Sequence, residues 1–265
     1  MDNSFKFKKK FGQNFLIDKN IVNKIVDSIS YKPNSLVLEI GCGDGRLTTS
    51  LCEKFDHVLG FEIDLEVKDR LLTNLSRFSN YDIIFDDFLK VDLNGVIEKY
   101  EYDNLYVIAN LPYYITTPII EKLINSDLDF ESINVMVQKE VADRFCAVVG
   151  DKNYNSLTVY LNYYFNIKKL FDVSRNCFVP RPNVDSSVVS FVSKDNKLYL
   201  NNQELFFSIV RDSFRFKRKT LKNNLNNYDL ERIRKVLLKY GYDLSVRAED
   251  LSLEVFCDIA NELSI

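Results

Sequence analysis

One corner of the chain combines residue types that could recognise an amine. An apolar run, residues 104–109, ends at Asn110, Leu111, Pro112 and Tyr113. The Asn110 side-chain oxygen and a backbone carbonyl of Leu111 or Pro112 can accept the two hydrogens of an exocyclic amine. Such acceptors favour the pyramidal amine that attacks a methyl sulfonium, and Tyr113 can stack on a planar base. The alternative is a proline that ends a strand beside a half-buried tyrosine.

A glycine-rich turn lies earlier in the chain, within the run LVLEIGCGDGRLTT. It places Gly41, Gly43 and Gly45 between an apolar segment and an amphipathic segment. Glycine lets a ligand approach the backbone, and a helix N-terminus offers unpaired N–H groups. The spacing G-x-G-x-G differs from the dinucleotide pattern and from the P-loop. It suits a nucleoside with a short zwitterionic tail, and S-adenosylmethionine fits that description. A tight turn without a ligand is the alternative.

Two acidic residues follow the next two apolar runs. Glu62, within the run GFEID, ends the second predicted strand and lies 21 residues after Gly41. An acid at about this spacing commonly binds ribose hydroxyls in nucleotide-binding folds. Asp87, in IIFDDF, could accept a hydrogen bond from an adenine amine, and a solvated loop acid is the alternative.

These residues stand at the ends of alternating short strands and helices. Strands are predicted at 35–40, 57–63, 81–87, 104–111 and 133–137, and helices at 18–29, 46–54, 65–75 and 117–124. This alternation predicts βαβ units and a parallel sheet covered on both faces. Residues 156–165 are ambiguous between helix and strand, and 178–192 read as a loop that leads into a strand. From about residue 201 onward every segment is predicted to be helical.

The pattern therefore predicts an α/β domain followed by a small all-helical domain. The boundary is expected near residues 195–197, which gives domains 1–195 and 196–265.

Composition excludes several classes of protein and of site. No apolar run approaches the ~18 residues that span a bilayer, and the N-terminus lacks the apolar core of a secretory signal. A cytoplasmic protein without a membrane partner is expected. The five cysteines form no C-x-x-C pair, so neither zinc nor disulfides are expected. His57 is the only histidine and is expected to be a strand-edge residue, so we expect no metal site and no histidine-based triad.

A basic cluster interrupts a chain whose net charge is −3. Residues 211–239 hold ten Lys and Arg against three acids. Its first part, the basic segment, comprises Arg211, Arg215, Lys217, Arg218, Lys219 and Lys222. Local charge of this kind favours RNA binding, and a solvated helical face is the alternative. The first ten residues add Lys6, Lys8, Lys9 and Lys10.

The order of several motifs resembles the rRNA adenine N6-methyltransferases, and within them the KsgA/RsmA dimethyladenosine transferases. The matching runs are KKKFGQNFLID, LEIGCGDGRLT, GFEID, NLPYYITTP, VQKEVADRF, FVPRPNVDSSVV, FRFKRKTLKNNL and RAEDLSLEVF. The resemblance implies a Rossmann-like methyltransferase domain with a small helical C-terminal domain that faces rRNA. It implies transfer of two methyl groups from S-adenosylmethionine to N6 of each of two adjacent adenosines. These lie in a hairpin loop near the 3′ end of small-subunit (16S) rRNA, within a pre-30S-type particle, and a monomer is expected.

The resemblance also implies roles for single residues. Cofactor contacts are expected at Asn14, Leu16, Gly41, Gly43, Glu62, Asp87 and Asn110. Contacts to the target base are expected at Asn110, Leu111, Pro112 and Tyr113, with Phe178 as a second aromatic wall.

Three features depart from the family pattern. Tyr114 stands where Asn is usual, Thr116 stands where Ser is usual, and the chain is acidic overall. Two other functions remain open: an Erm-type methyltransferase of large-subunit rRNA, and a non-catalytic ribosome-assembly or transcription factor on the same fold. The complete set of Gly41, Glu62, Asn110 and Tyr113 argues against loss of catalysis.

Overall fold

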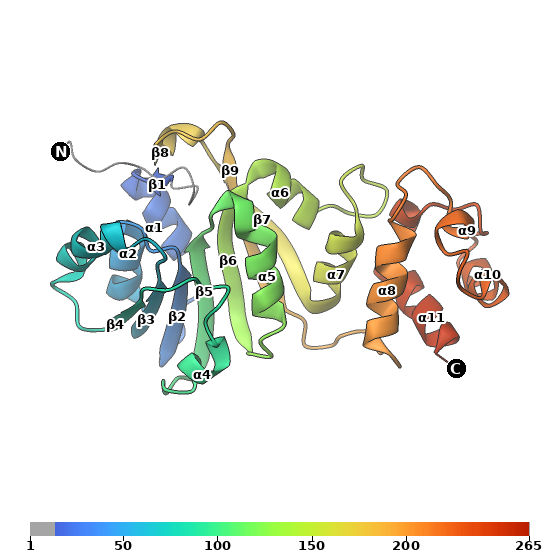
Figure 1. Ribbon diagram of the computed structural model, residues 1–265, viewed down its shortest axis with the longest axis horizontal. Coiled ribbons are helices and arrows are strands. Elements are labelled where there is room, and N and C mark those ends of the chain that lie inside the picture. Colours follow the sequence, from blue (N-terminus) through green and yellow to red (C-terminus); the bar gives the residue numbers. More distant parts are fainter. Residues whose placement is uncertain (1–13, 265) are drawn as a thin grey trace. The chain divides into compact units, whose positions relative to one another are not determined.

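The computed structural model describes residues 14–264, and Figure 1 shows the order of their elements. The strands are β1 (Phe15–Leu16), β2 (Ser35–Ile40), β3 (His57–Phe61), β4 (Tyr81–Ile84), β5 (Asn104–Asn110), β6 (Phe130–Gln138), β7 (Phe165–Val173), β8 (Phe178–Val179) and β9 (Ser186–Ser193). The four lysines of the first ten residues, and most of the motif KKKFGQNFLID, lie outside the described residues.

The α-helices include those that the periodicity of the sequence predicted and two short ones, at residues 93–97 and 139–145, that it did not. They are α1 (Lys19–Asp27), α2 (Arg46–Lys54), α3 (Lys68–Leu75), α4 (Leu93–Ile97), α5 (Thr116–Ile124), α6 (Lys139–Phe145), α7 (Ser156–Tyr164), α8 (Gln203–Ser213), α9 (Leu221–Asn224), α10 (Leu230–Lys239) and α11 (Leu253–Leu263). Short 3₁₀ turns occur at η2 (Leu65–Val67), η3 (Tyr113–Ile115), η4 (Arg175–Cys177) and η5 (Ala248–Asp250). Asp18 caps α1: its carboxylate accepts from the N–H groups of Asn20 at 2.9 Å and Ile21 at 3.4 Å.

A seven-stranded sheet, in the order β4-β3-β2-β5-β6-β9-β7, forms the centre of the α/β fold. The first five strands in this order are parallel, as predicted. The expectation of a purely parallel sheet was wrong at β9, which pairs antiparallel with β6. The parallel strands carry the site, because their carboxyl ends meet along one edge.

Both faces of the sheet are covered by other elements. All six residues of β2 are buried, so neither of its faces meets solvent. On one face, Val37 and Ile108 of the sheet pack with Val22 of α1, Leu51 of α2 and Leu71 of α3. Continuous burial explains why the central strands are apolar runs rather than alternating patterns.

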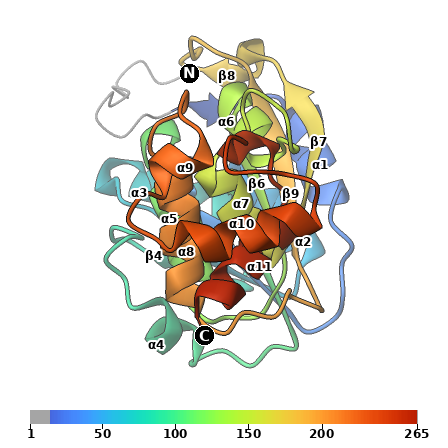
Figure 2. The same cartoon turned by 90° about the vertical axis from the view of Figure 1, so that its right-hand side faces the viewer.

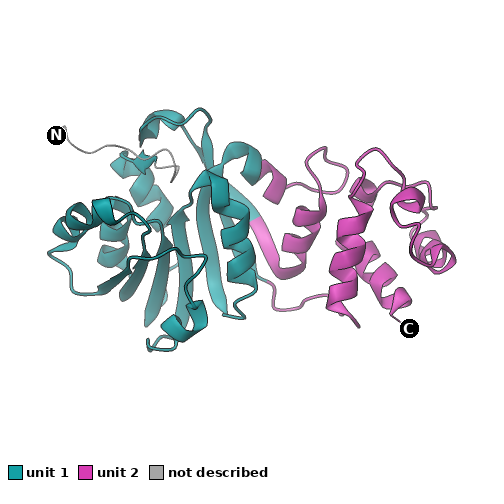
Figure 3. Ribbon diagram, viewed as in Figure 1, with its two compact units in different colours: residues 1–142, 168–193 teal, residues 143–167, 194–265 magenta. Residues whose placement is uncertain are grey.

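The chain packs into two compact units (Figure 3). Among the described residues, the first unit contains 14–142 and 168–193, and the second contains 143–167 and 194–264. This division differs from the single boundary expected near residue 195, because α7 packs with the C-terminal helices. The ambiguous segment 156–165 is this helix, and it runs directly into β7.

The second unit has a hydrophobic core of its own, and Figure 2 shows the helices α8, α10 and α11 that contribute to it. Phe206 of α8, Ile233 and Leu237 of α10, and Phe256 and Ile259 of α11 are all fully buried in it. Residues at i and i+3 or i+4 share one helix face, which is why the spacing in the sequence predicted these helices. Within residues 14–264, no helix combines the length and the apolar character needed to cross a membrane.

Candidate functional site

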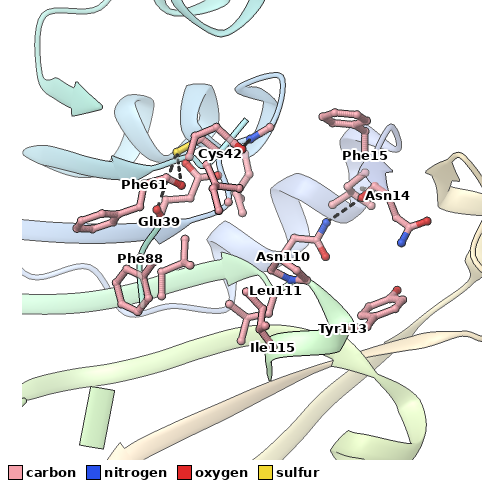
Figure 4. A pocket seen from close by; sticks show the side chains of 18 of the residues that line it. Asn14, Phe15, Glu39, Cys42, Phe61, Phe88, Asn110, Leu111, Tyr113 and Ile115 are labelled. Carbon is pink, nitrogen blue, oxygen red and sulfur yellow. Dashed lines mark hydrogen bonds between the residues drawn. The ribbon is translucent and has the colours of Figure 1, made fainter. Parts of the chain in front are cut away.

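A cavity in the first unit lies at the carboxyl ends of β2, β3, β4 and β5 (Figure 4). The turn after each of these strands contributes residues to the lining of the cavity, and so does β1. Of the residues expected to bind cofactor or base, the cavity is lined by Asn14, Leu16, Gly41, Gly43, Glu62, Asp87, Asn110, Leu111, Pro112 and Tyr113. Residues up to 99 positions apart in sequence are therefore brought together around one space.

Glu62 presents a buried carboxyl group whose orientation is set by the backbone. Its side chain is 7% exposed. One oxygen accepts from the N–H of Gly43 at 2.8 Å, and the other accepts from the N–H of Asp64 at 2.7 Å. Burial raises the pKa of this carboxyl group, although the same two N–H groups oppose the rise. The contacts hold Glu62 against the glycine turn, where its remaining lone pairs can accept hydrogen bonds from a ligand.

The glycine turn requires glycine for two reasons. Gly43 has φ +55°, and a Cβ atom at that position would stand 2.8 Å from the ring of Phe15. Gly41 has φ +82°, and the nearest atoms to a Cβ there would be Asn110 O and Pro112 Cδ, both at 3.9 Å. The backbone of Gly41 thus faces residues 110–113, the Asn110 corner, with no side chain between the two. A ligand can therefore approach the Gly41 backbone.

The Asn110 corner offers two hydrogen-bond acceptors. Asn110 donates from Nδ2 to the backbone carbonyl of Asn14 at 3.1 Å (Figure 4), so its Oδ1 atom points elsewhere. The Pro112 carbonyl already accepts from Ile115 N at 3.2 Å and from the Thr116 hydroxyl at 3.3 Å. Across residues 14–264, no donor reaches Asn110 Oδ1 or the Leu111 carbonyl. Of the two backbone carbonyls that the sequence left open, the structure leaves that of Leu111 available.

Tyr113 forms a wall of the cavity, and its hydroxyl group is tied down. It shares a hydrogen bond of 2.6 Å with the hydroxyl of Ser186, a fully buried residue at the start of β9. Burial raises the pKa of the Tyr113 hydroxyl above its ordinary value. The hydrogen bond to Ser186 fixes the orientation of the Tyr113 ring, because it holds the hydroxyl group at the outer end of that ring.

The analysis of the sequence did not select Glu39, which also lines the cavity. This side chain is 1% exposed, and its Oε2 atom has no hydrogen-bond partner within residues 14–264. Burial raises the pKa of the carboxyl group to about 8, and the Glu62 carboxylate adds to the rise. The available signal was an acid inside the apolar run SLVLEI, since a charged residue in a central strand is rare.

Aromatic side chains supply the apolar part of the lining, and these were missed too. Phe61 and Phe88 meet edge-to-face with ring centroids 5.1 Å apart, beside Asp87. Phe15 and Tyr114 also line the cavity, and Tyr114 is 55% exposed. The departure from the family pattern at position 114 therefore lies on the rim of the site, whereas Thr116 is buried beneath it.

Phe178 does not lie where the resemblance suggested. It pairs with Leu16 through the antiparallel strands β1 and β8, is 2% exposed and packs into the core of the first unit. It is not among the residues that line the cavity. Its burial with Leu16 holds the N-terminal strand beside the site.

The basic segment lies in the second unit, at the end of α8, in the following turn and in α9. All six of its basic residues are exposed. Lys217 donates from its Nζ to the carbonyl of Lys152 at 3.1 Å, and Arg211 Nε lies 3.8 Å from Asp212 Oδ1.

His57 and four of the five cysteines do not line the cavity. His57 bonds Asp82 at 3.0 Å at the start of β3 and packs on the ring of Tyr100. Cys42 lines the cavity but is buried, and burial raises the pKa of its thiol. Across residues 14–264, no group of histidine, cysteine and acidic side chains could hold a metal ion.

Comparison with known proteins gives a consistent assignment. Residues 4–264 match the profile of the family described as "Ribosomal RNA adenine dimethylase". The chain is 42% identical over 269 residues to ribosomal RNA small subunit methyltransferase A of Geobacillus kaustophilus, which covers 98% of this chain and 92% of the relative. The protein of the same name from Clostridium botulinum is 41% identical and covers 95% of this chain and 92% of the relative.

Solved structures support the same fold. A dimethyladenosine transferase from Plasmodium falciparum superposes with a TM-score of 0.78 at 28% identity, covering 92% of this chain and 95% of that one. The 23S rRNA methyltransferase ErmE reaches a TM-score of 0.76 at 24% identity, covering 95% and 100%, and shows a shared fold alone. The chain therefore belongs to the ribosomal RNA adenine dimethylase family of S-adenosylmethionine-dependent methyltransferases, as its sequence motifs predicted.

Proposed function

We propose that this chain is a cytoplasmic enzyme that transfers two methyl groups to N6 of each of two adjacent adenosines of small-subunit rRNA. The target is a hairpin loop near the 3′ end of that rRNA, and the modification serves maturation of the small subunit. The observation that carries the proposal is a pair of acceptors, Asn110 Oδ1 and the Leu111 carbonyl, which no donor within residues 14–264 reaches and which lie in the cavity that Tyr113 also lines. The names of the similar bacterial proteins support small-subunit rRNA as the substrate.

The lining of the cavity fits S-adenosylmethionine. The exposed backbone at Gly41 admits a ligand, the fixed Glu62 carboxylate can accept from ribose hydroxyls, and Asp87 can accept from the adenine amine. The Phe61 and Phe88 rings offer an apolar surface to the adenine. Asn14, Leu16 and Gly43 complete the proposed cofactor set. When bound, the cofactor supplies an electrophilic methyl group on a sulfonium.

The Asn110 corner accounts for the choice of an adenine amine. An exocyclic amine has two N–H donors and a lone pair that is conjugated with its ring. Acceptance of one hydrogen by Asn110 Oδ1 and of the other by the Leu111 carbonyl draws the nitrogen towards a pyramidal geometry and frees the lone pair. Preorganised acceptors of this kind stabilise the positive charge that develops on the nitrogen. Pro112 keeps the Leu111 carbonyl in place through its own bonds to Ile115 and Thr116.

Tyr113 positions the base, and no strong general base is required. Its ring offers a stacking face whose direction is set by the bond to Ser186. The methylated amine is a strong acid while cationic, so it loses a proton to water. Adenosines in a hairpin loop are already partly unstacked, which lowers the cost of bringing them to the site.

The proposed partner is rRNA within a pre-30S-type particle, bound by a monomer of this chain. The exposed basic segment of the second unit supports RNA binding, since Lys and Arg side chains release counterions when they meet phosphates.

Mass spectrometry of rRNA tests the proposal directly. Small-subunit particles and large-subunit rRNA, both lacking adenine dimethylation, are incubated with the protein and S-adenosylmethionine. The expected product is small-subunit rRNA with two N6,N6-dimethyladenosines in neighbouring positions. Methylation confined to large-subunit rRNA would support the Erm-type alternative. Binding to the particle without any methyl transfer would support the non-catalytic one.

A further inference from the structure

We propose that Phe216 stacks on an unpaired base of the bound RNA, within the basic segment. The inference rests on the proposed function, because it concerns how the same rRNA is held. Phe216 lies in the turn between α8 and α9, and its side chain is 54% exposed. Arg215 precedes it, and Lys217, Arg218 and Lys219 follow it, all of them exposed. A large apolar ring is thus displayed at the centre of a strongly positive turn.

The backbone of this turn is held firmly even though the ring is not packed. Asn224 is buried, and its amide donates to the carbonyl of Ser213 at 2.6 Å and to that of Phe216 at 3.3 Å. The Phe216 carbonyl also accepts from the N–H of Lys219 at 2.9 Å. The position of Phe216 is therefore fixed by hydrogen bonds rather than by burial of its side chain. A backbone that is already ordered loses little conformational freedom on binding, which favours a role of this turn in recognition.

The surroundings of the ring indicate the chemistry of its partner. The Arg215 guanidinium lies 5.4 Å from the centroid of the Phe216 ring, so a cation and a π-face stand together. Lys217 is directed to the carbonyl of Lys152, and Arg218 and Lys219 are exposed in the same turn. Single-stranded nucleic acid meets both demands, since its phosphates pair with the cations and its bases stack on aromatic rings. An apolar protein surface could pack against the Phe216 ring, but it would leave the basic side chains of the same turn without anionic partners.

Salt dependence separates stacking from charge pairing. Phe216→Ala should weaken the binding of naked small-subunit rRNA by about fivefold to a hundredfold, the range for loss of one base–aromatic stack. Because stacking releases no counterions, a plot of log affinity against log salt should shift without a change of slope. Phe216→Tyr, which keeps the ring, should bind as the parent does. Tyr199→Ala is the matched control, because Tyr199 is 77% exposed and precedes the opposite end of α8.

A fluorescent reporter gives an independent measurement. The chain contains no tryptophan, so Phe216→Trp introduces the only indole. Addition of single-stranded oligoadenylate should quench its emission, because a stacked base deactivates the excited ring. The same substitution at position 199 should show no quenching.

Defined outcomes would overturn the inference. Unchanged affinity of Phe216→Ala for naked rRNA, or a changed salt slope, would show that the ring makes no stacking contact. Weakened binding to the intact particle together with unchanged binding to naked rRNA would assign Phe216 to a protein partner. If the parent protein methylates no small-subunit rRNA but the indole at 216 is quenched, the proposed function fails and the stacking contact stands.

Discussion

The hydroxyl groups of Tyr113 and Ser186 lie 2.6 Å apart and join the loop after β5 to the first residue of β9. This bond holds the ring that is proposed to stack on the target adenine. We expect Ser186→Ala and Tyr113→Phe each to lower single-turnover methyl transfer by about fivefold, since one hydrogen bond contributes ~1 kcal/mol. The double variant should lose no more than either single variant, because both remove the same bond. If the losses of activity in the two single variants added up in the double variant, the two hydroxyl groups would not act through one shared hydrogen bond.

The ring of Tyr113 should matter more than its hydroxyl. Tyr113→Ala removes a stacking face worth ~1–3 kcal/mol, whereas Tyr113→Phe retains it. Single-turnover rates with small-subunit particles should therefore fall further for Tyr113→Ala than for Tyr113→Phe. A Tyr113→Ala enzyme with full activity would remove the ring from the base site.

Asn110 should contribute chiefly to the chemical step. Asn110→Ala removes one preorganised acceptor, and we expect methyl transfer to fall by ~10²–10³, by analogy with loss of one oxyanion-hole donor. Particle binding should change little, because the basic segment lies in the other unit. Asn104→Ala, at the opposite end of β5, is the matched control and should leave the rate unchanged. Dimethylation by Asn110→Ala at the parent rate would exclude the proposed amine site.

Glu62 should determine cofactor affinity. Glu62→Ala removes a carboxylate that is held against the glycine turn, and loss of a charge-assisted hydrogen bond costs ~1.5–3 kcal/mol. Calorimetry with S-adenosylmethionine should therefore show binding roughly ten- to a hundredfold weaker. Glu53→Ala, on the exposed surface of α2, serves as a control with the same loss of charge. Unchanged affinity in Glu62→Ala would place the ribose elsewhere.

Glu39 should make the stability of the protein depend on pH. Its pKa is about 8 in the folded chain, raised by burial, against an ordinary value of 4.5. Between these two values the folded state retains a proton that the unfolded state has lost. The contribution of the protonated Glu39 to the free energy of unfolding is therefore fully present below pH 4.5. It is lost as the pH rises to 8, by up to ~1.4 kcal/mol per pH unit.

Glu39→Gln is uncharged at every pH and lacks this contribution. Urea unfolding between pH 5 and pH 8 should show a free energy of unfolding that declines less steeply for Glu39→Gln than for the parent protein. Parallel profiles would mean that Glu39 is ionised in the folded chain.

The basic segment should govern the salt dependence of particle binding. Arg218→Ala combined with Lys219→Ala removes two exposed charges, and we expect the slope of log affinity against log salt to flatten by about 1.5. Lys99→Ala, an exposed lysine of the first unit, should leave the slope unchanged. An unaltered slope in the double variant would favour a solvated helical face.

Much of the fold could be predicted from local patterns. The helices α1, α2 and α5 lie where the spacing of apolar residues placed them, because each buries one face set by the helical period. The strand β2 was recognisable as a continuous apolar run, because both of its faces are buried. The strand β7 was missed. This strand lies at one edge of the sheet, and its exposed lysines interrupt the run of apolar residues that would predict a strand.

The residues around the cavity could be selected from sequence for a simple reason. Parallel strands joined by helices bring their carboxyl ends to one edge, so Gly41, Glu62, Asp87 and Asn110 had to converge there. Tertiary structure decided what sequence spacing cannot express. It paired Tyr113 with Ser186, left the Leu111 carbonyl available rather than that of Pro112, and buried Phe178 in the core. Each of these depends on contacts between distant segments, whose geometry arises only when the sheet and its loops pack together.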